Sequence, residues 1–161
     1  MQLENSKKSV KINKIRYIAI ISFIVIVIVL VTTDLIREAF LGLNKYHWAV
    51  IVTLLYILEN IYEYLKDFNY IYYSDEGEKI IFRYVSLRPL QNKRYSIEMN
   101  KANFIGYKVV RSPLNFKQQI IFYVKTPNGS AKYPPVSITG LSTDQFNSLK
   151  HALNQFQTQQ V

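Results

Sequence analysis

The sequence predicts an α+β membrane protein, in which two transmembrane helices precede a domain of six or seven antiparallel strands and one closing helix. Three observations predict this class. Two apolar stretches lie near the N-terminus, the residues from 68 to 138 alternate between apolar and polar, and an amphipathic segment follows them. The chain accordingly divides into a basic cytosolic leader (1–16), a hairpin (17–66), a folded domain (67–157) and a polar tail (158–161).

The first apolar stretch, residues 15–33, predicts a membrane-spanning helix. About nineteen residues at about 1.5 Å rise cover about 28 Å, close to the hydrocarbon thickness of a bilayer. No charge lies between Tyr17 and Thr33. A cleaved signal peptide would also place basic residues ahead of an apolar core. The core is too long for that interpretation, and residues 31–35 offer no small-residue cleavage site.

The second stretch, residues 48–65, begins as a clean apolar run and then admits Glu59, Asn60 and Glu63. Trp48 at one end and tyrosines at the other are typical of anchors at the two membrane surfaces, which favours a span over an interfacial helix. On a helix, Tyr56 and the three polar residues share one side. Two explanations stay open: Glu59 and Glu63 are solvated at headgroup level, or they face a partner helix or the cytosolic domain.

The basic residues around the spans predict the orientation. The leader carries five (Lys7, Lys8, Lys11, Lys14 and Arg16), whereas the loop between the spans carries Arg37 and Lys45. Basic flanks stay in the cytosol. Both termini are therefore expected on the cytosolic side of a multi-pass protein.

The formal net charge of +9 is concentrated in the leader and after residue 66, both on the expected cytosolic side. Anionic lipid headgroups explain such a charge. Nucleic acid is the competing partner, but the chain contains no recognised nucleic-acid motif, and we expect none to bind. The absence of cysteine excludes disulfides, thiolate metal sites and cysteine nucleophiles. With two histidines and no phosphate-binding glycine loop, no metal, cofactor or catalytic residue is predicted.

The folded domain is read as six strands and a helix. Strands are expected over residues 68–74, 79–86, 94–99, 104–110, 117–125 and 130–138, with the last one broken at Pro134 and Pro135. Ser142 and Gln145 form a capping box that starts the final helix. That helix has an apolar stripe, which must bury against the sheet.

This order of elements resembles the bacterial membrane proteins with a pleckstrin-homology-like (PH-like) domain. The resembling segments are residues 70–84, residues 131–138 and the terminal helix, and a hairpin ahead of the domain is also typical of that family. The resemblance implies a PH-like barrel or sandwich in a bacterial cytoplasmic membrane, acting as an interaction or assembly module and not as an enzyme. The alternative is an accessory subunit of a membrane transporter or enzyme complex. The chain departs from lipid-binding members of the wider fold, because its first turn carries Asp75, Glu76 and Glu78.

Seven residues are candidate contacts for the membrane surface or for a partner. They are Lys79, Arg83, Arg88, Lys93, Arg94, Glu59 and Glu63. The competing interpretation of the five cations is an ordinary solvated sheet surface. Expected partners are the bilayer and either another protein or further copies of the chain. A peptide groove lined by Tyr70, Tyr72, Tyr73 and Tyr84 is a further hypothesis, as is pairing at an exposed sheet edge.

Overall fold

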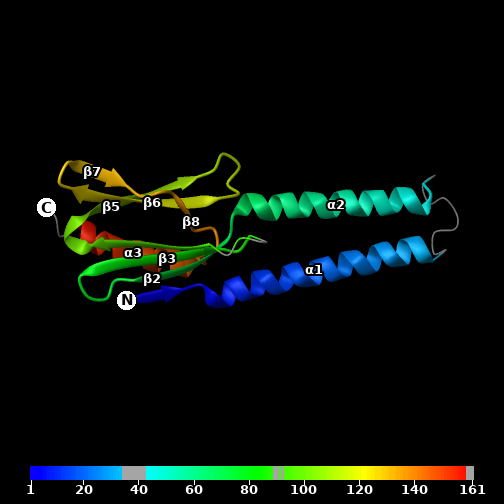
Figure 1. Cartoon of the computed structure of the whole chain (residues 1–161), viewed down its shortest axis with the longest axis horizontal. Coiled ribbons are helices and arrows are strands. Elements are labelled where there is room, and N and C mark those ends of the chain that lie inside the picture. The colour runs from blue at the N-terminus through cyan, green and yellow to red at the C-terminus, as the bar shows by residue number, and fades with distance from the viewer. Residues whose placement is uncertain (34–42, 89–90, 92, 159–161) are drawn as a thin grey trace. The chain divides into compact units, whose positions relative to one another are not determined.

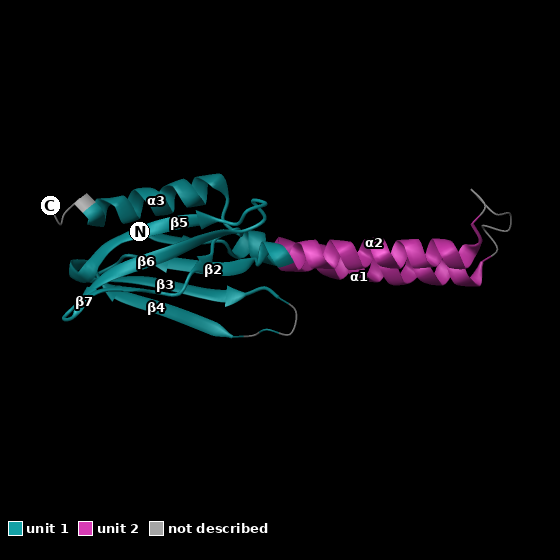
Figure 2. Ribbon diagram, turned by 90° about the horizontal axis from the view of Figure 1, so that it is seen from above, with its two compact units in different colours: residues 1–10, 65–161 teal, residues 11–64 magenta. Residues whose placement is uncertain are grey.

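A computed structural model describes residues 1–33, 43–88, 91 and 93–158 of the chain. Its residues divide into two compact units, coloured separately in Figure 2. Unit 1 comprises Met1–Val10 and Leu65–Val161, and unit 2 comprises Lys11–Tyr64. Most of the loop between the predicted spans, including Arg37, and residues 159–161 of the predicted tail lie outside the described residues.

Unit 2 consists of most of two helices, α1 (Ser6–Thr32) and α2 (Lys45–Lys66). The predicted spans fall within them apart from residue 33, and both helices are long and apolar enough to cross a membrane. Their apolar windows are unburied, because side chains such as Ile21 and Leu58 are exposed. The helices contact each other where the rings of Phe23 and Tyr56 stack, with centroids 4.1 Å apart.

Unit 1 contains two antiparallel four-stranded sheets (Figure 1). The first has the order β1 (Gln2–Glu4), β2 (Asn69–Ser74), β3 (Lys79–Ser86) and β4 (Arg94–Asn100). The second contains β5 (Phe104–Arg111), β6 (Gln118–Thr126) and β7 (Gly129–Lys132), and β8 (Val136–Ser137) also pairs with β6. A short 3₁₀ helix, Lys101–Asn103, connects the two sheets. The strand pairings of the described residues give no closed barrel.

The core lies between the two sheets. Alternate residues of each strand point inward, so Phe82 of β3 meets Phe122 of β6 with ring centroids 5.1 Å apart. Helix α3 (Thr143–Thr158) adds Leu149 and Leu153, both fully buried, to the same cluster. The expected arrangement of strands followed by one packed helix is therefore confirmed in its α+β form.

Local sequence signals set several of the boundaries. The predicted strands agree with the structure to within one or two residues at most ends, and Pro134 and Pro135 separate β7 from β8 as expected. The capping box is also confirmed. The Ser142 backbone N–H donates to Gln145 Oε1 at 3.0 Å, and the Gln145 N–H donates to Ser142 Oγ at 3.2 Å.

The first ten residues differ from the expected leader. Residues 2–4 form β1, which pairs antiparallel with β2 so that Leu3 lies opposite Tyr73. Leu3 is buried in the core, and the amino group of Met1 pairs with Asp75. Helix α1 begins at Ser6, within the predicted leader. The start of the chain is thus part of the folded unit that follows the second helix.

Candidate functional site

The outer face of the first sheet carries a shallow groove of about 690 Å³. Its lining combines aromatic and aliphatic side chains with two guanidinium groups: Tyr70, Tyr72, Arg83, Val85, Leu87, Arg94, Tyr95 and Ser96. Most of these side chains lie on the face opposite the core because strand residues alternate, and the register places Tyr72 beside Arg83 and Val85 beside Arg94. Two of the seven predicted contacts, Arg83 and Arg94, therefore come together here.

The charges in this groove are exposed. Arg83 Nη2 lies 4.0 Å from Glu98 Oε1, and both side chains are about half exposed, so this pair contributes little to stability. Tyr70 donates a hydrogen bond to Glu4 Oε2 at 3.1 Å. Partial burial and this hydrogen bond to Glu4 raise the pKa of Tyr70, which stays a neutral donor at physiological pH. A partner with both apolar and acidic groups would match this surface.

The predicted tyrosine groove is only partly assembled. Tyr70 and Tyr72 line the observed groove, whereas Tyr73 points into the core and is fully buried. Tyr84 packs against the core and stacks on Tyr95, with ring centroids 5.0 Å apart. Strand alternation separates Tyr73 from Tyr72. The sequence did not single out Tyr95, which belongs to the groove.

Arg88 lies in a different place, where it is paired with Asp67. Asp67 follows the last residue of α2 and has a φ of 50°. Its carboxylate accepts Arg88 Nη2 at 3.0 Å and Lys117 Nζ at 2.5 Å. We call these three residues the Asp67 cluster. It ties the loops after β3 and before β6 to the residue that follows α2.

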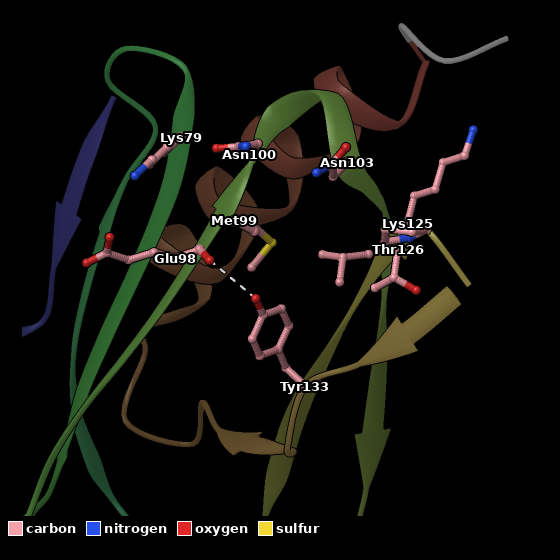
Figure 3. A pocket seen from close by; sticks show the side chains of 10 residues that line it. Lys79, Glu98, Met99, Asn100, Asn103, Lys125, Thr126 and Tyr133 are labelled. Carbon is pink, nitrogen blue, oxygen red and sulfur yellow. Dashed lines mark hydrogen bonds between the residues drawn. The ribbon is translucent and has the colours of Figure 1, made fainter. Parts of the chain in front are cut away.

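Lys79 is located at the opposite end of the first sheet, in the pocket of Figure 3. The register pairs it with Asn100, and the pocket has a volume of about 360 Å³. Across it, the Tyr133 hydroxyl donates to the Glu98 backbone oxygen at 3.2 Å, joining the second sheet to the edge of β4 (Figure 3). Lys93, which is exposed, precedes β4 and does not line this pocket. The five predicted cations therefore do not form one surface.

The polar side of α2 is divided. Glu63 Oε2 lies 3.9 Å from Arg16 Nη2 of α1, and the ring of Tyr56 stacks on Phe23 of the same helix. Glu59 and Asn60 are exposed, and the Asn60 amide donates to the Tyr56 backbone oxygen at 2.8 Å. The partner helix of Glu63 is thus the other helix of its own hairpin.

A buried polar network holds the first residues of the chain against β2. The Asn5 amide donates to the Asn69 oxygen at 2.9 Å and to the Gly140 oxygen at 3.3 Å, and its Oδ1 accepts the Ile71 N–H at 2.7 Å. Ser9 donates to the same Oδ1 at 3.3 Å. The chain therefore leaves β1 beside the residues at which it returns from α2. Sequence reasoning missed this network, whose only local signal is an asparagine before a helix.

No protein-family model, curated protein or solved structure matches this chain. Within the described residues, no group of three or more histidine, aspartate or glutamate side chains is arranged to hold a metal ion. The features that the site offers are consequently a mixed aromatic and cationic groove, an ion-pair cluster at the end of α2 and two exposed apolar helices.

Proposed function

We propose that this chain is a two-span protein of a bacterial cytoplasmic membrane, and that its folded unit is a PH-like interaction module on the cytoplasmic face. Its groove binds another protein at the membrane surface. The fold supports the PH-like assignment in part, because two antiparallel sheets pack around one core and a C-terminal helix buries against them.

One observation carries the membrane proposal. Asn5 directly precedes α1 and Asn69 begins the first strand after α2, and these two residues are hydrogen-bonded to each other. Two apolar helices that begin and end at one place on a folded unit fit a hairpin that crosses a bilayer once in each direction, which supports the proposal. Removal of the first helix as a signal peptide would also remove β1 and Asn5 from the fold, which supports an uncleaved N-terminus.

The orientation can be tested with single cysteines, since the wild-type chain has none. Tyr46 at the start of α2 and Ser130 in β7 are both exposed. In intact cells, a membrane-impermeant maleimide should label a Tyr46→Cys variant. A Ser130→Cys variant should react only after the membrane is opened, and labelling of Ser130→Cys from outside would contradict the orientation.

The sheet edge favours a different protein over a second copy as the partner. β4 is an outer strand of its sheet, and Arg94 at its start lies opposite Val85 near the end at which the chain crosses to the helices. In a second copy paired antiparallel along β4, the residues that connect the sheet to the helices would lie at the opposite end of the joined sheet. Because the two hairpins would then leave the joined sheet at opposite ends, we propose a different protein as the partner.

Partner binding through the groove is tested by affinity purification in mild detergent. Arg94→Glu and Tyr95→Ala change exposed groove residues, whereas Lys132→Glu changes an exposed residue of β7 and serves as the control. We expect both groove variants to lose an associated protein that wild type and the control retain. Equal recovery with all four proteins would reject the groove as the binding surface.

Glu59 supports the second candidate function, an accessory subunit of a membrane transporter or enzyme complex. Its side chain is exposed on a part of α2 whose other residues, apart from Asn60, are mainly apolar. Ionisable groups at membrane depth generally face a partner or a polar pathway. A Glu59→Leu variant that fails to co-purify with a stoichiometric larger complex would favour this candidate over the groove.

A further inference from the structure

We infer that the end of unit 1 around the Asp67 cluster rests in the headgroup layer of an anionic bilayer, with Leu114 as an apolar contact at its tip. The inference rests on the proposed hairpin, and it names the lipid-contacting surface of the folded unit. This surface differs from the predicted set of five cations, because Lys79 lies at the other end and Arg83 on the sheet face.

The depth of this end follows from the helices. Arg16 and Glu63 form an ion pair at the point where the uncharged part of α1 begins, which places the pair at the hydrocarbon boundary. Asp67 follows Glu63 by four residues, and at about 1.5 Å per residue it lies about 6 Å further out. The headgroup layer is about 5–8 Å thick on each side. Asp67 is therefore at headgroup depth.

Asp67 brings two loops to that depth. Arg88, two residues after β3, pairs with it, as does Lys117, which directly precedes β6. The Leu87 N–H also donates to the Phe68 oxygen at 2.9 Å. The loops cannot withdraw from the membrane surface without breaking these contacts.

Charge is unequally distributed between the two ends of unit 1. Asp67 is the one acidic residue among the described residues 5–10, 65–68, 86–88, 93–94 and 111–117. The same segments contain eight cations: Lys7, Lys8, Lys66, Arg88, Lys93, Arg94, Arg111 and Lys117. The turn at the far end of β2 instead carries Asp75, Glu76 and Glu78. Because Lys79, Lys101, Lys125 and Lys132 at that far end only roughly balance these carboxylates, an anionic surface attracts the first end much more strongly than the second.

A tight turn presents Leu114 among these cations. The Asn115 N–H donates to the Ser112 oxygen at 2.9 Å, and the Ser112 N–H donates to the Lys117 oxygen at 2.9 Å. Asn115 has a φ of 55°, which asparagine tolerates better than most residues. Leu114 is 71% exposed at the tip. An apolar side chain beside cations matches the headgroup boundary, where both anionic groups and hydrocarbon are within reach.

The test uses the full-length protein reconstituted in phosphatidylcholine bilayers with or without phosphatidylglycerol. Single cysteines at Leu114 or, as a control at the far end of β6, at Ser130 carry an environment-sensitive fluorophore. Lipids with a spin label on the headgroup serve as the quencher. We expect strong quenching and a blue shift at position 114 in the anionic bilayer, weaker effects in the neutral bilayer, and little quenching at position 130.

Variants that each remove one positive charge test whether the cations at this end cause the docking. Lys93→Gln and Arg111→Gln remove exposed cations at this end, and each should lower the ratio of docked to undocked molecules by about fivefold. Lys79→Gln and Lys132→Gln, exposed at the other end, should leave the ratio unchanged. Equal quenching at positions 114 and 130, or equal effects of both variant pairs, would overturn the inference. If labelling at Tyr46 and Ser130 still reports a hairpin, the proposed orientation survives that result.

Discussion

Replacing Asn5 with alanine should weaken unit 1 more than any surface change. The variant removes four side-chain hydrogen bonds and leaves the N–H of Ile71, which is fully buried, without its acceptor. An unsatisfied buried donor costs about 1–3 kcal/mol, and each weakened carbonyl bond to Asn69 and Gly140 adds about 1 kcal/mol. The sum, about 3–5 kcal/mol, is a large part of the roughly 5–15 kcal/mol that stabilises a typical domain.

The assay is thermal unfolding of the full-length protein in mild detergent, followed by the tyrosine signal in near-ultraviolet circular dichroism. For a unit of roughly 100 residues, this loss corresponds to a fall in midpoint on the order of 15–25 °C. Ser9→Ala is the matched control, because it removes only the 3.3 Å bond to Asn5 and should cost about 1 kcal/mol or less. If Asn5→Ala unfolds within about 1 kcal/mol of wild type, the first residues are a loose leader and the proposed packing is wrong.

Three further variants test other parts of unit 1. A Cβ on Gly140 would lie 2.8 Å from the Asn69 oxygen and 2.9 Å from Asn5 Nδ2. Gly140→Ala should therefore lower the free energy of unfolding by about 1–3 kcal/mol, as measured by thermal unfolding. Ser142→Ala breaks one half of the capping box and should cost about 1 kcal/mol in a denaturant titration; an unchanged midpoint would contradict the cap. Burial raises the pKa of Tyr73, so its neutral form stabilises the fold below pH about 10, and this contribution falls at higher pH. As the pH is raised from about 9 to about 11, the free energy of unfolding should therefore fall less in Tyr73→Phe than in wild type, as measured by unfolding at each pH.

Local patterns were sufficient for elements that depend on near neighbours. The alternation of residues 79–86 predicts β3, and Ser142 with Gln145 predicts the start of α3, because strand faces and helix caps are determined within a few residues. β1 could not be found in this way. It has three residues, too few for alternation to be recognised, and its partner β2 begins 65 residues after it ends.

The candidate site was harder to predict because the predicted cations, although alike in charge, lie in different environments. Arg83 and Arg94 line one groove because of the strand register, which depends on how β3 and β4 pair and cannot be read from composition. Arg88 is instead engaged by Asp67, a residue that the sequence did not single out. Lys79 begins β3 four residues before Arg83, and most of the strand separates it from Arg88 and Arg94. Counting cations in this segment therefore overestimates the size of any single basic surface.

The pairing of β1 with β2 also constrains the order in which the protein is made. Residues 2–4 are synthesised before the helices, but the strand that receives them is synthesised only after both helices. If the proposed hairpin inserts into a membrane, closing this long loop requires residues 2–4 to stay on the side where unit 1 will form. Residues 2–4 are thus among the last to reach their final positions although they precede both helices, and under the proposed topology an error in membrane insertion would leave the folded unit without one edge of its first sheet.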